Sequence, residues 1–198
     1  MTQVVLATKN LGKVRELQRI LEPFSVDLVM AAYEPGPETG LSFEDNAVAK
    51  AREGMAATGL PALADDSGLT VLAMRGMPGI FSARWAGRHG DDQANLDLLL
   101  AQLSDVPDGV RGASFVCAAA YCMPSGVTGV VTAELTGCVI REPRGSNGFG
   151  YDPVFVPSGY DVTSAELPPE EKDAISHRGK AFRELAPLFA EALAAESE

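Results

Sequence analysis

Apolar residues along the chain recur in two patterns, short uninterrupted runs and longer stretches with helical spacing. The uninterrupted runs are typical of buried strands and predict strands over 4–7 and 26–30. Apolar residues that return every three or four positions predict helices with one buried side. Such helices are expected over 13–24, 42–57, 91–103 and 178–195.

The second half of the chain has the composition of a sheet. Segments rich in Val, Ala, Cys, Thr and Tyr predict a meander of antiparallel strands over 113–123, 127–135 and 136–140. Their alternation is imperfect, which favours a sheet that is covered on both faces. A further strand is expected over 154–156, and a short helical segment begins in 168–172.

Capping residues stand in front of three of the predicted helices. Ser42 with Asp45 resembles a capping box, in which a hydroxyl and an acid three residues later satisfy free N–H groups. Asp91 or Asp92 is the expected N-cap of the third helix, and Ser176 that of the last. These residues support the predicted helix starts.

Two adjacent acids, Asp65 and Asp66, lie between the apolar runs 61–64 and 69–72, where a buried strand is expected to end or bend. Buried carboxylates are costly unless a cation compensates them. Mg²⁺ or a Lys/Arg pair would do so, and two carboxylates beside the hydroxyl of Ser67 are hard oxygen ligands suited to Mg²⁺. The alternative is a solvated Asp-Asp-Ser-Gly turn, which this stretch taken alone favours. The rest of the chain reverses that preference.

The segment 8–13 connects a predicted strand with a predicted helix and is rich in donors. Such a turn exposes backbone N–H groups at the positive end of the helix dipole, an arrangement suited to an anion. Lys13 lies in or near the first helical turn, where a cation opposes the dipole, and a bound phosphate would explain it. The glycine spacing of a Walker loop is missing. Phosphate binding is the favoured interpretation, and a solvated lysine is the alternative.

Cations crowd a second helix start, at His177, Arg178 and Lys180. In a chain with a net charge of −11, two such anomalies favour a polyanionic ligand over solvation alone. Lys50 borders the apolar side of the helix over 42–57, which leads into the acidic pair. Its side chain either extends to solvent or faces that site.

Two loops combine turn formers with large side chains. The segment 76–85 contains three large apolar or aromatic residues, which favours an ordered, packed loop that borders a ligand. In 144–153, glycines let the backbone approach a ligand, and Phe149 and Tyr151 offer surfaces for a flat ring. The alternative for this second loop is an ordinary hairpin with one packed aromatic residue.

Composition limits the class of protein. The 198 residues, 46% of them apolar, can bury a core, and one domain or two tightly joined lobes is expected over 1–198. The negative charge argues against a general nucleic-acid binder, which needs a basic surface. Apolar stretches too short for a bilayer and the absence of a signal-like start predict a soluble cytoplasmic protein without a membrane partner. Cys117, Cys122 and Cys138 lack metal-ligand spacing, which favours reduced thiols over disulfides or zinc.

Six motifs follow one another over nearly the whole chain: 7–13, 39–43 with Glu44, Asn46 and Lys50, 64–69, 78–84, 148–153, and 171–172 with 175–179. Together they resemble the motifs of the inosine triphosphate pyrophosphatase family, whose members clear non-standard purine nucleoside triphosphates. Lys9 stands where many members carry glycine.

This resemblance implies hydrolysis of ITP, dITP or XTP to the nucleoside monophosphate and pyrophosphate. It implies a two-lobed α/β fold, with an extended, curved mixed β-sheet flanked by helices and the active-site cleft between the lobes. It further implies Mg²⁺ as cofactor and a homodimer.

The resemblance also implies roles for the matching positions. Asp66 would accept a proton, Asp65 would assist, and Glu38 with Asp66 would hold Mg²⁺. Lys50, counted as catalytic, and Ser67 would contact phosphate. The triphosphate would lie on Thr8, Lys9, Asn10, Leu11, Gly12 and Lys13, and the nucleoside on Phe149, Gly150, Tyr151, Asp152, Lys172, His177 and Arg178.

The residue types agree with this chemistry. Breaking the linkage between the α- and β-phosphates requires neutralising a polyanion, orienting a water opposite the leaving group and activating that water. Lys13 and Lys50 can spread the developing charge. Neither of the two histidines lies in a triad-like context.

Three alternatives remain. A Maf-type nucleotide pyrophosphatase would prefer pyrimidine or modified nucleotides. A phosphatase that uses Asp66 as a covalent nucleophile would be expected to carry an Asp-x-Asp pattern. A nucleotide-binding regulator without turnover would have little use for an intact acidic pair and a full set of cations.

Overall fold

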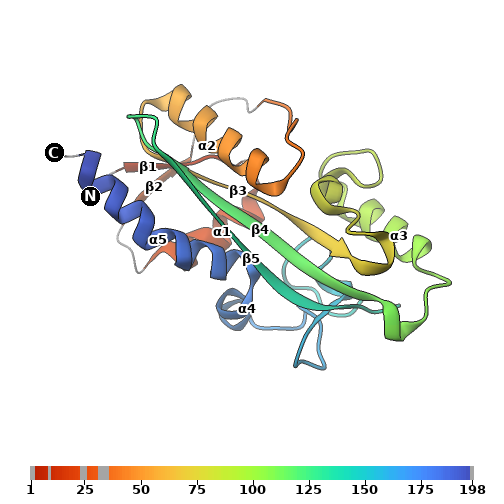
Figure 1. The fold of residues 1–198 in the computed structure, drawn as a ribbon. Coiled ribbons are helices and arrows are strands. Elements are labelled where there is room, and N and C mark those ends of the chain that lie inside the picture. The colour runs from red at the N-terminus through yellow and green to blue at the C-terminus, as the bar shows by residue number, and fades with distance from the viewer. Residues whose placement is uncertain (1–2, 9, 23–25, 31–35, 197–198) are drawn as a thin grey trace. The chain divides into compact units, whose positions relative to one another are not determined.

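A computed structural model describes residues 3–8, 10–22, 26–30 and 36–196, and within these ranges six strands form one mixed sheet flanked by helices (Figure 1). The strands are β1 Gln3–Leu6, β2 Asp27–Met30, β3 Ala62–Val71, β4 Gly112–Cys122, β5 Thr128–Val139 and β6 Phe155–Pro157. The α-helices are α1 Leu11–Leu21, α2 Phe43–Thr58, α3 Asp92–Gln102, α4 Pro169–Ile175 and α5 His177–Glu196. The strand order is β2-β1-β3-β4-β5-β6, with β1 parallel to β2 and β3, and β5 antiparallel to β6. The predicted α/β class with a mixed sheet is confirmed.

The predicted helices are present, and the caps predicted at Ser42 and Asp91 act as expected. The Ser42 hydroxyl accepts a hydrogen bond from the Asp45 N–H at 3.0 Å, and the Asp91 carboxylate accepts one from the Ala94 N–H at 3.2 Å. The first helix begins at Leu11, earlier than predicted, and its predicted end at Phe24 lies outside the described residues. None of the helices in the described ranges is long and apolar enough to cross a membrane.

The prediction of separate strands over 127–135 and 136–140 was wrong, because β5 runs through both segments without a break. Gly137 explains the difference. It pairs with Pro157 of β6, and a Cβ at this position would collide with the Val156 carbonyl and the Phe155 ring. The glycine therefore marks a close approach between two strands, which a local pattern cannot distinguish from a turn.

The chain forms two compact units. The first comprises Met1–Asp66, Cys117–Ala133 and Arg178–Glu198, and the second comprises Ser67–Val116 and Glu134–His177. In the first unit, alternate residues of β4, together with Met123, which follows it, enter different cores. Cys117, Ala119, Tyr121 and Met123 join the cluster that α1 and α5 cover, and Ala118, Ala120 and Cys122 join the one that α2 covers. The prediction of a sheet covered on both faces is thus confirmed for this strand.

The core of the second unit lies between α3 and the strands. Leu96 and Leu99 of α3, and Leu103 directly after it, are buried with apolar residues of β3, β4, β5 and β6. The loop predicted over 76–85 contains a 3-10 helix, Gly79–Arg84. Its Ser82 hydroxyl accepts a hydrogen bond from the Leu69 N–H of β3 at 2.9 Å, so this loop is ordered and attached to the strand.

Candidate active site

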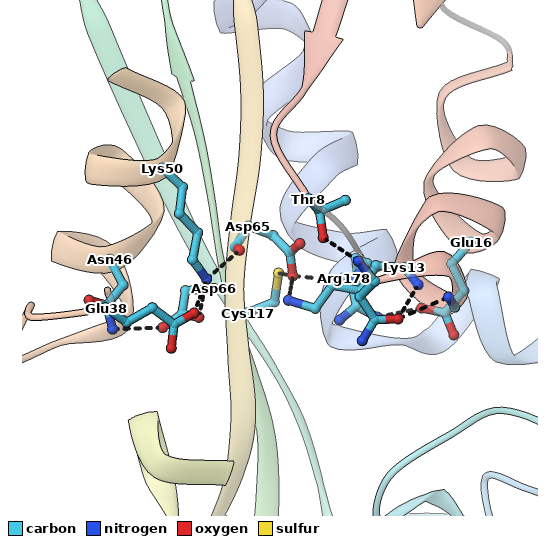
Figure 2. A network of polar contacts seen from close by, with 12 residues as sticks. Thr8, Lys13, Glu16, Glu38, Asn46, Lys50, Asp65, Asp66, Cys117 and Arg178 are labelled. Carbon is cyan, nitrogen blue, oxygen red and sulfur yellow. Dashed lines mark hydrogen bonds and ion pairs between the residues drawn. The ribbon is translucent and has the colours of Figure 1, made fainter. Parts of the chain in front are cut away.

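Asp65 and Asp66 lie in the middle of β3, and the expectation that the strand ends or bends there was wrong. Both are buried, with exposed fractions of 1% and 5%, which also excludes a solvated turn. Because successive side chains of a strand point to opposite faces, the two carboxylates face different surroundings. Figure 2 shows them on either side of β3, each among its own set of cations and polar groups.

The carboxylate of Asp66 faces α2 and the segment that precedes it. Lys50 of α2 places its ammonium 2.7 Å from Asp66 Oδ1 and 2.5 Å from Glu38 Oε1 (Figure 2). Asn46, one helical turn earlier, donates from Nδ2 to Asp66 Oδ2 at 3.0 Å. The structure therefore brings together three residues that the sequence assigned to metal and phosphate binding, namely Glu38, Lys50 and Asp66.

Burial and charge act in opposite directions on this group. Burial raises the pKa of the Asp66 carboxyl and outweighs the nearby ammonium groups of Lys50 and Lys13. Burial lowers the pKa of Lys50, but the carboxylates of Asp66 and Glu38 raise this pKa by more than burial lowers it. The ammonium therefore stays charged. A carboxyl with a raised pKa beside a permanent cation can exchange a proton with a bound water more readily than an ordinary aspartate.

The carboxylate of Asp65 faces α1 and α5. Lys13 Nζ lies 2.8 Å and Arg178 Nε 3.3 Å from Asp65 Oδ2, and Arg178 Nη1 also pairs with Glu16 (Figure 2). Burial raises the pKa of Asp65, but Lys13 and Arg178 lower it more, and the pKa lies well below its usual range. Asp65 is therefore an ionised counter-charge that holds two cations. The buried Cys117 thiol, 3.9 Å from Asp65 Oδ2, has a raised pKa because of burial and this carboxylate.

These ion pairs supply a second reason for the cations at the two helix starts. Bound phosphate was inferred because Lys13 and Arg178 oppose the helix dipoles, and buried acids also compensate both of them. The sequence analysis missed Glu16, which is 5% exposed. A signal was present, since Glu16 lies four residues before Ile20 on the apolar side of α1.

The turn between β1 and α1 is capped from within. Asn10 Oδ1 accepts hydrogen bonds from the N–H groups of Gly12 at 2.9 Å and Lys13 at 3.2 Å, and Asn10 N–H donates to Thr8 Oγ1. The expectation that these N–H groups are free was wrong for Gly12 and Lys13, because asparagine is a strong N-cap residue. Leu11 is 63% exposed. Lys9 lies outside the described residues.

A second group of predicted residues lies in the second unit. Asp152 Oδ2 accepts hydrogen bonds from Lys172 Nζ at 2.7 Å and from the Phe149 N–H at 2.9 Å. The Lys172 ammonium lies 5.4 Å from the centre of the half-buried Phe149 ring. Gly148, with φ of +76°, is required here because a Cβ would collide with the Asp152 carboxylate. Gly150 donates from its N–H to Asp92.

Two further predicted residues of this unit are packed into its interior. Tyr151 is 4% exposed, and its hydroxyl donates to the Ser82 carbonyl at 2.9 Å. Burial raises the pKa of this hydroxyl. The His177 ring, 6% exposed, stacks on Phe115 with ring centres 5.0 Å apart. Ser67, which follows Asp66 in β3, is half-buried.

Comparison with known proteins identifies the family of this chain. The Ham1 family profile matches residues 4–188. A dITP/XTP pyrophosphatase of Streptomyces avermitilis is 58% identical over 199 residues, which cover 98% of this chain and all of the relative. A crystal structure of a nucleoside-triphosphatase, or dITP/XTP pyrophosphatase, from Mycobacterium abscessus superposes with a TM-score of 0.76 at 56% identity, covering 94% of this chain and all of that one. A HAM1 protein from Coxiella burnetii reaches a TM-score of 0.86 at 40% identity, covering 96% and 100%. This chain therefore belongs to the Ham1 family.

Proposed function

We propose that this chain hydrolyses non-standard purine nucleoside triphosphates, such as ITP, dITP and XTP, to the monophosphate and pyrophosphate. Full-length relatives named dITP/XTP pyrophosphatases support this activity. The observation that carries it is the group of buried Asp66 and half-buried Glu38 and Lys50, in which two carboxylates converge on one cation. Hydrolysis of a polyanion needs such a combination of cations and a proton acceptor.

The residues fit a magnesium ion. The Lys50 ammonium between Glu38 Oε1 and Asp66 Oδ1 shows that these two oxygens can approach one positive charge. Within the described ranges no three acidic, histidine or cysteine side chains converge as a complete metal site. This agrees with Mg²⁺, which takes one or two carboxylates and completes its shell with water and phosphate oxygens. Glu38 and Asp66 would hold the ion, and the bound ion would polarise the triphosphate.

Each side chain near the acidic pair has its own proposed role. Asp66 accepts a proton from the attacking water, and the Lys50 ammonium would contact the phosphates. Asp65 assists by fixing Lys13 and Arg178 on the other face of β3. The segment Thr8 to Lys13 binds the triphosphate, and Ser67 contacts the same phosphates. A phosphate bound to this segment competes with the Asn10 side chain for the N–H groups of Gly12 and Lys13.

For the nucleoside, the half-buried Phe149 offers a ring face, and Lys172 and Asp152 fix the loop that carries it. Gly150, Tyr151, His177 and Arg178 complete the proposed set, with Tyr151 and His177 supporting the pocket from the interior. A homodimer and a cytoplasmic location also belong to this proposal.

A pyrophosphate-release assay over a panel of triphosphates tests the function. ITP, dITP and XTP should be hydrolysed with kcat/KM at least about a hundredfold above that for ATP. Release of pyrophosphate and IMP is expected, and release of inorganic phosphate with IDP would contradict the proposal. A preference for pyrimidine triphosphates would favour the Maf-type alternative, and binding without turnover would favour a regulator.

Removal of divalent metal is expected to abolish activity. After treatment with EDTA, turnover of ITP should fall by at least about a hundredfold, because without a cation the carboxylates of Glu38 and Asp66 repel the triphosphate. Added Mg²⁺ or Mn²⁺ should restore the rate of pyrophosphate release. Full activity in metal-free buffer would contradict a metal held by these two acids.

Phe149 and Tyr151 are expected to respond differently to truncation. Phe149→Ala should raise the KM for ITP about tenfold, since stacking on a base contributes about 1–3 kcal/mol, and should change stability little. Tyr151→Ala should instead lower the free energy of unfolding by about 3–5 kcal/mol, because the ring belongs to the core. Urea denaturation and steady-state kinetics measure both effects. Equal KM effects in two stable variants would place both rings in the pocket.

A further inference from the structure

Asn46 uses both ends of its side chain in the group around Asp66. It lies in α2, is 1% exposed, and donates from Nδ2 to Asp66 Oδ2 at 3.0 Å. Its Oδ1 accepts a hydrogen bond from the Gly40 N–H at 2.8 Å. Because a backbone N–H can only donate, the amide oxygen must face Gly40 and the NH₂ group must face Asp66. The orientation of the amide is thus fixed by its partners.

This amide connects the two acids that converge on Lys50. Its nitrogen donates a hydrogen bond to Asp66 Oδ2, and Lys50 donates to the other oxygen, Oδ1. Its oxygen holds the backbone of Gly40, two residues after Glu38. Asn46 therefore sets the position of the Glu38 segment relative to the Asp66 carboxylate.

The surrounding residues permit this contact only because they are small. A Cβ at Gly40 would lie 2.5 Å from Asn46 Oδ1 and 3.0 Å from Asn46 N, closer than real Cβ atoms tolerate. On the sheet side, Ala47 and Ala51 of α2 meet Ala64 and Ala118, which lets the helix approach β3 closely. Small residues thus allow α2 to lie close both to the segment at Gly40 and to β3.

We propose that Asn46 is a positioning residue that sets the separation of Glu38 and Asp66 and thereby the affinity of the site for a divalent cation. This inference rests on the proposed metal role of those two acids. Residues that orient metal ligands through hydrogen bonds typically change metal affinity by about 10–100-fold when they are removed.

The test measures Mn²⁺ binding to the intact protein without nucleotide, by electron paramagnetic resonance of free Mn²⁺. Asn46→Ala should weaken Mn²⁺ binding about tenfold or more. The Mg²⁺ concentration for half-maximal turnover should rise by a similar factor, and kcat should recover in part at saturating Mg²⁺. Gly40→Ala, which displaces the same segment without touching Asp66, should also weaken Mn²⁺ binding and decides the question if Asn46→Ala does not fold.

Asn95 offers a matched control in the second unit. It is 2% exposed, accepts a hydrogen bond from the Ala86 N–H at 2.7 Å and donates to the Ala83 carbonyl at 3.2 Å. Asn95→Ala should lower stability to urea to a similar degree but keep Mn²⁺ affinity within about twofold. A folded Asn46→Ala or Gly40→Ala protein with wild-type Mn²⁺ affinity would overturn the inference.

Glu38→Gln separates this inference from the proposed function. If Glu38→Gln weakens Mn²⁺ binding and Asn46→Ala does not, only the role of Asn46 is wrong. If Glu38→Gln leaves Mn²⁺ affinity unchanged, the proposed metal site is wrong and the inference fails with it.

Discussion

Asp66→Asn is expected to lower kcat for ITP about a thousandfold or more. The amide keeps the shape of the carboxylate but removes its charge and its ability to accept a proton, and general-base catalysis contributes about 10²–10⁴ in rate. The substitution also removes one of the two ion pairs of Lys50, which then pairs with Glu38 but no longer with residue 66. Nucleotide affinity should stay within about tenfold, because the cations that hold the phosphates remain.

Steady-state pyrophosphate release at saturating Mg²⁺, together with calorimetric nucleotide titration, measures both effects. Asp65→Asn is the matched control, because it changes the neighbouring carboxylate, which faces Lys13 and Arg178 instead. We expect this control to lose stability more than turnover. A kcat within tenfold of wild type for Asp66→Asn would move the role of proton acceptor to another group, with Asp65 the first candidate.

Arg178→Met is expected to lower the free energy of unfolding by about 3–5 kcal/mol. Its guanidinium is 2% exposed and pairs with Glu16 and Asp65, and removing one partner of a buried ion pair leaves charge uncompensated. Urea denaturation measures the loss. The double variant with Glu16→Gln should recover part of it, because one of the two carboxylates is then neutral.

Arg183→Met, on the exposed side of the same helix, should cost less than about 1 kcal/mol and serves as the control. Arg178→Met and Arg183→Met variants of equal stability would show that the buried pairs contribute nothing. Such a result would remove Asp65 and Glu16 as the reason for placing an arginine there.

Arg178 also carries a prediction about the base. Inosine and xanthosine present a carbonyl at purine position 6, where adenosine presents an amino group, so a donor in the pocket favours the first two. A guanidinium has five N–H donors, so its pairs with two carboxylates do not exclude this contact. Arg178→Ala should narrow the ratio of kcat/KM for ITP over ATP by about tenfold or more. If both values fall by the same factor, Arg178 is a phosphate contact or a structural residue, and its assignment to base recognition is wrong.

Much of the local structure was predictable from short stretches of sequence. The serine and acid at 42 and 45, and the acid at 91, gave the starts of α2 and α3, because an N-cap depends on residues three positions apart. The spacing of apolar residues predicted α1 and α5, because that spacing also depends only on residues three or four positions apart. The motifs around Asp66 and Phe149 indicated the family before any contact was known, and the Ham1 profile confirms it.

The partners of the acidic pair were decided by the tertiary structure. Lys13 and Asp65 are 52 residues apart in the sequence, Arg178 and Asp65 are 113 apart, and Arg178 and Glu16 are 162 apart. A local pattern shows that a charge would be costly to bury, but it does not show which distant residues compensate that charge. The cost alone therefore made a turn plausible at Asp65 and Asp66. The strand instead continues, because α1 and α5 bring cations to one face and α2 brings Lys50 and Asn46 to the other. Since a strand alternates its side chains, two adjacent and chemically identical residues meet opposite faces, and their surroundings lower the pKa of one and raise the pKa of the other.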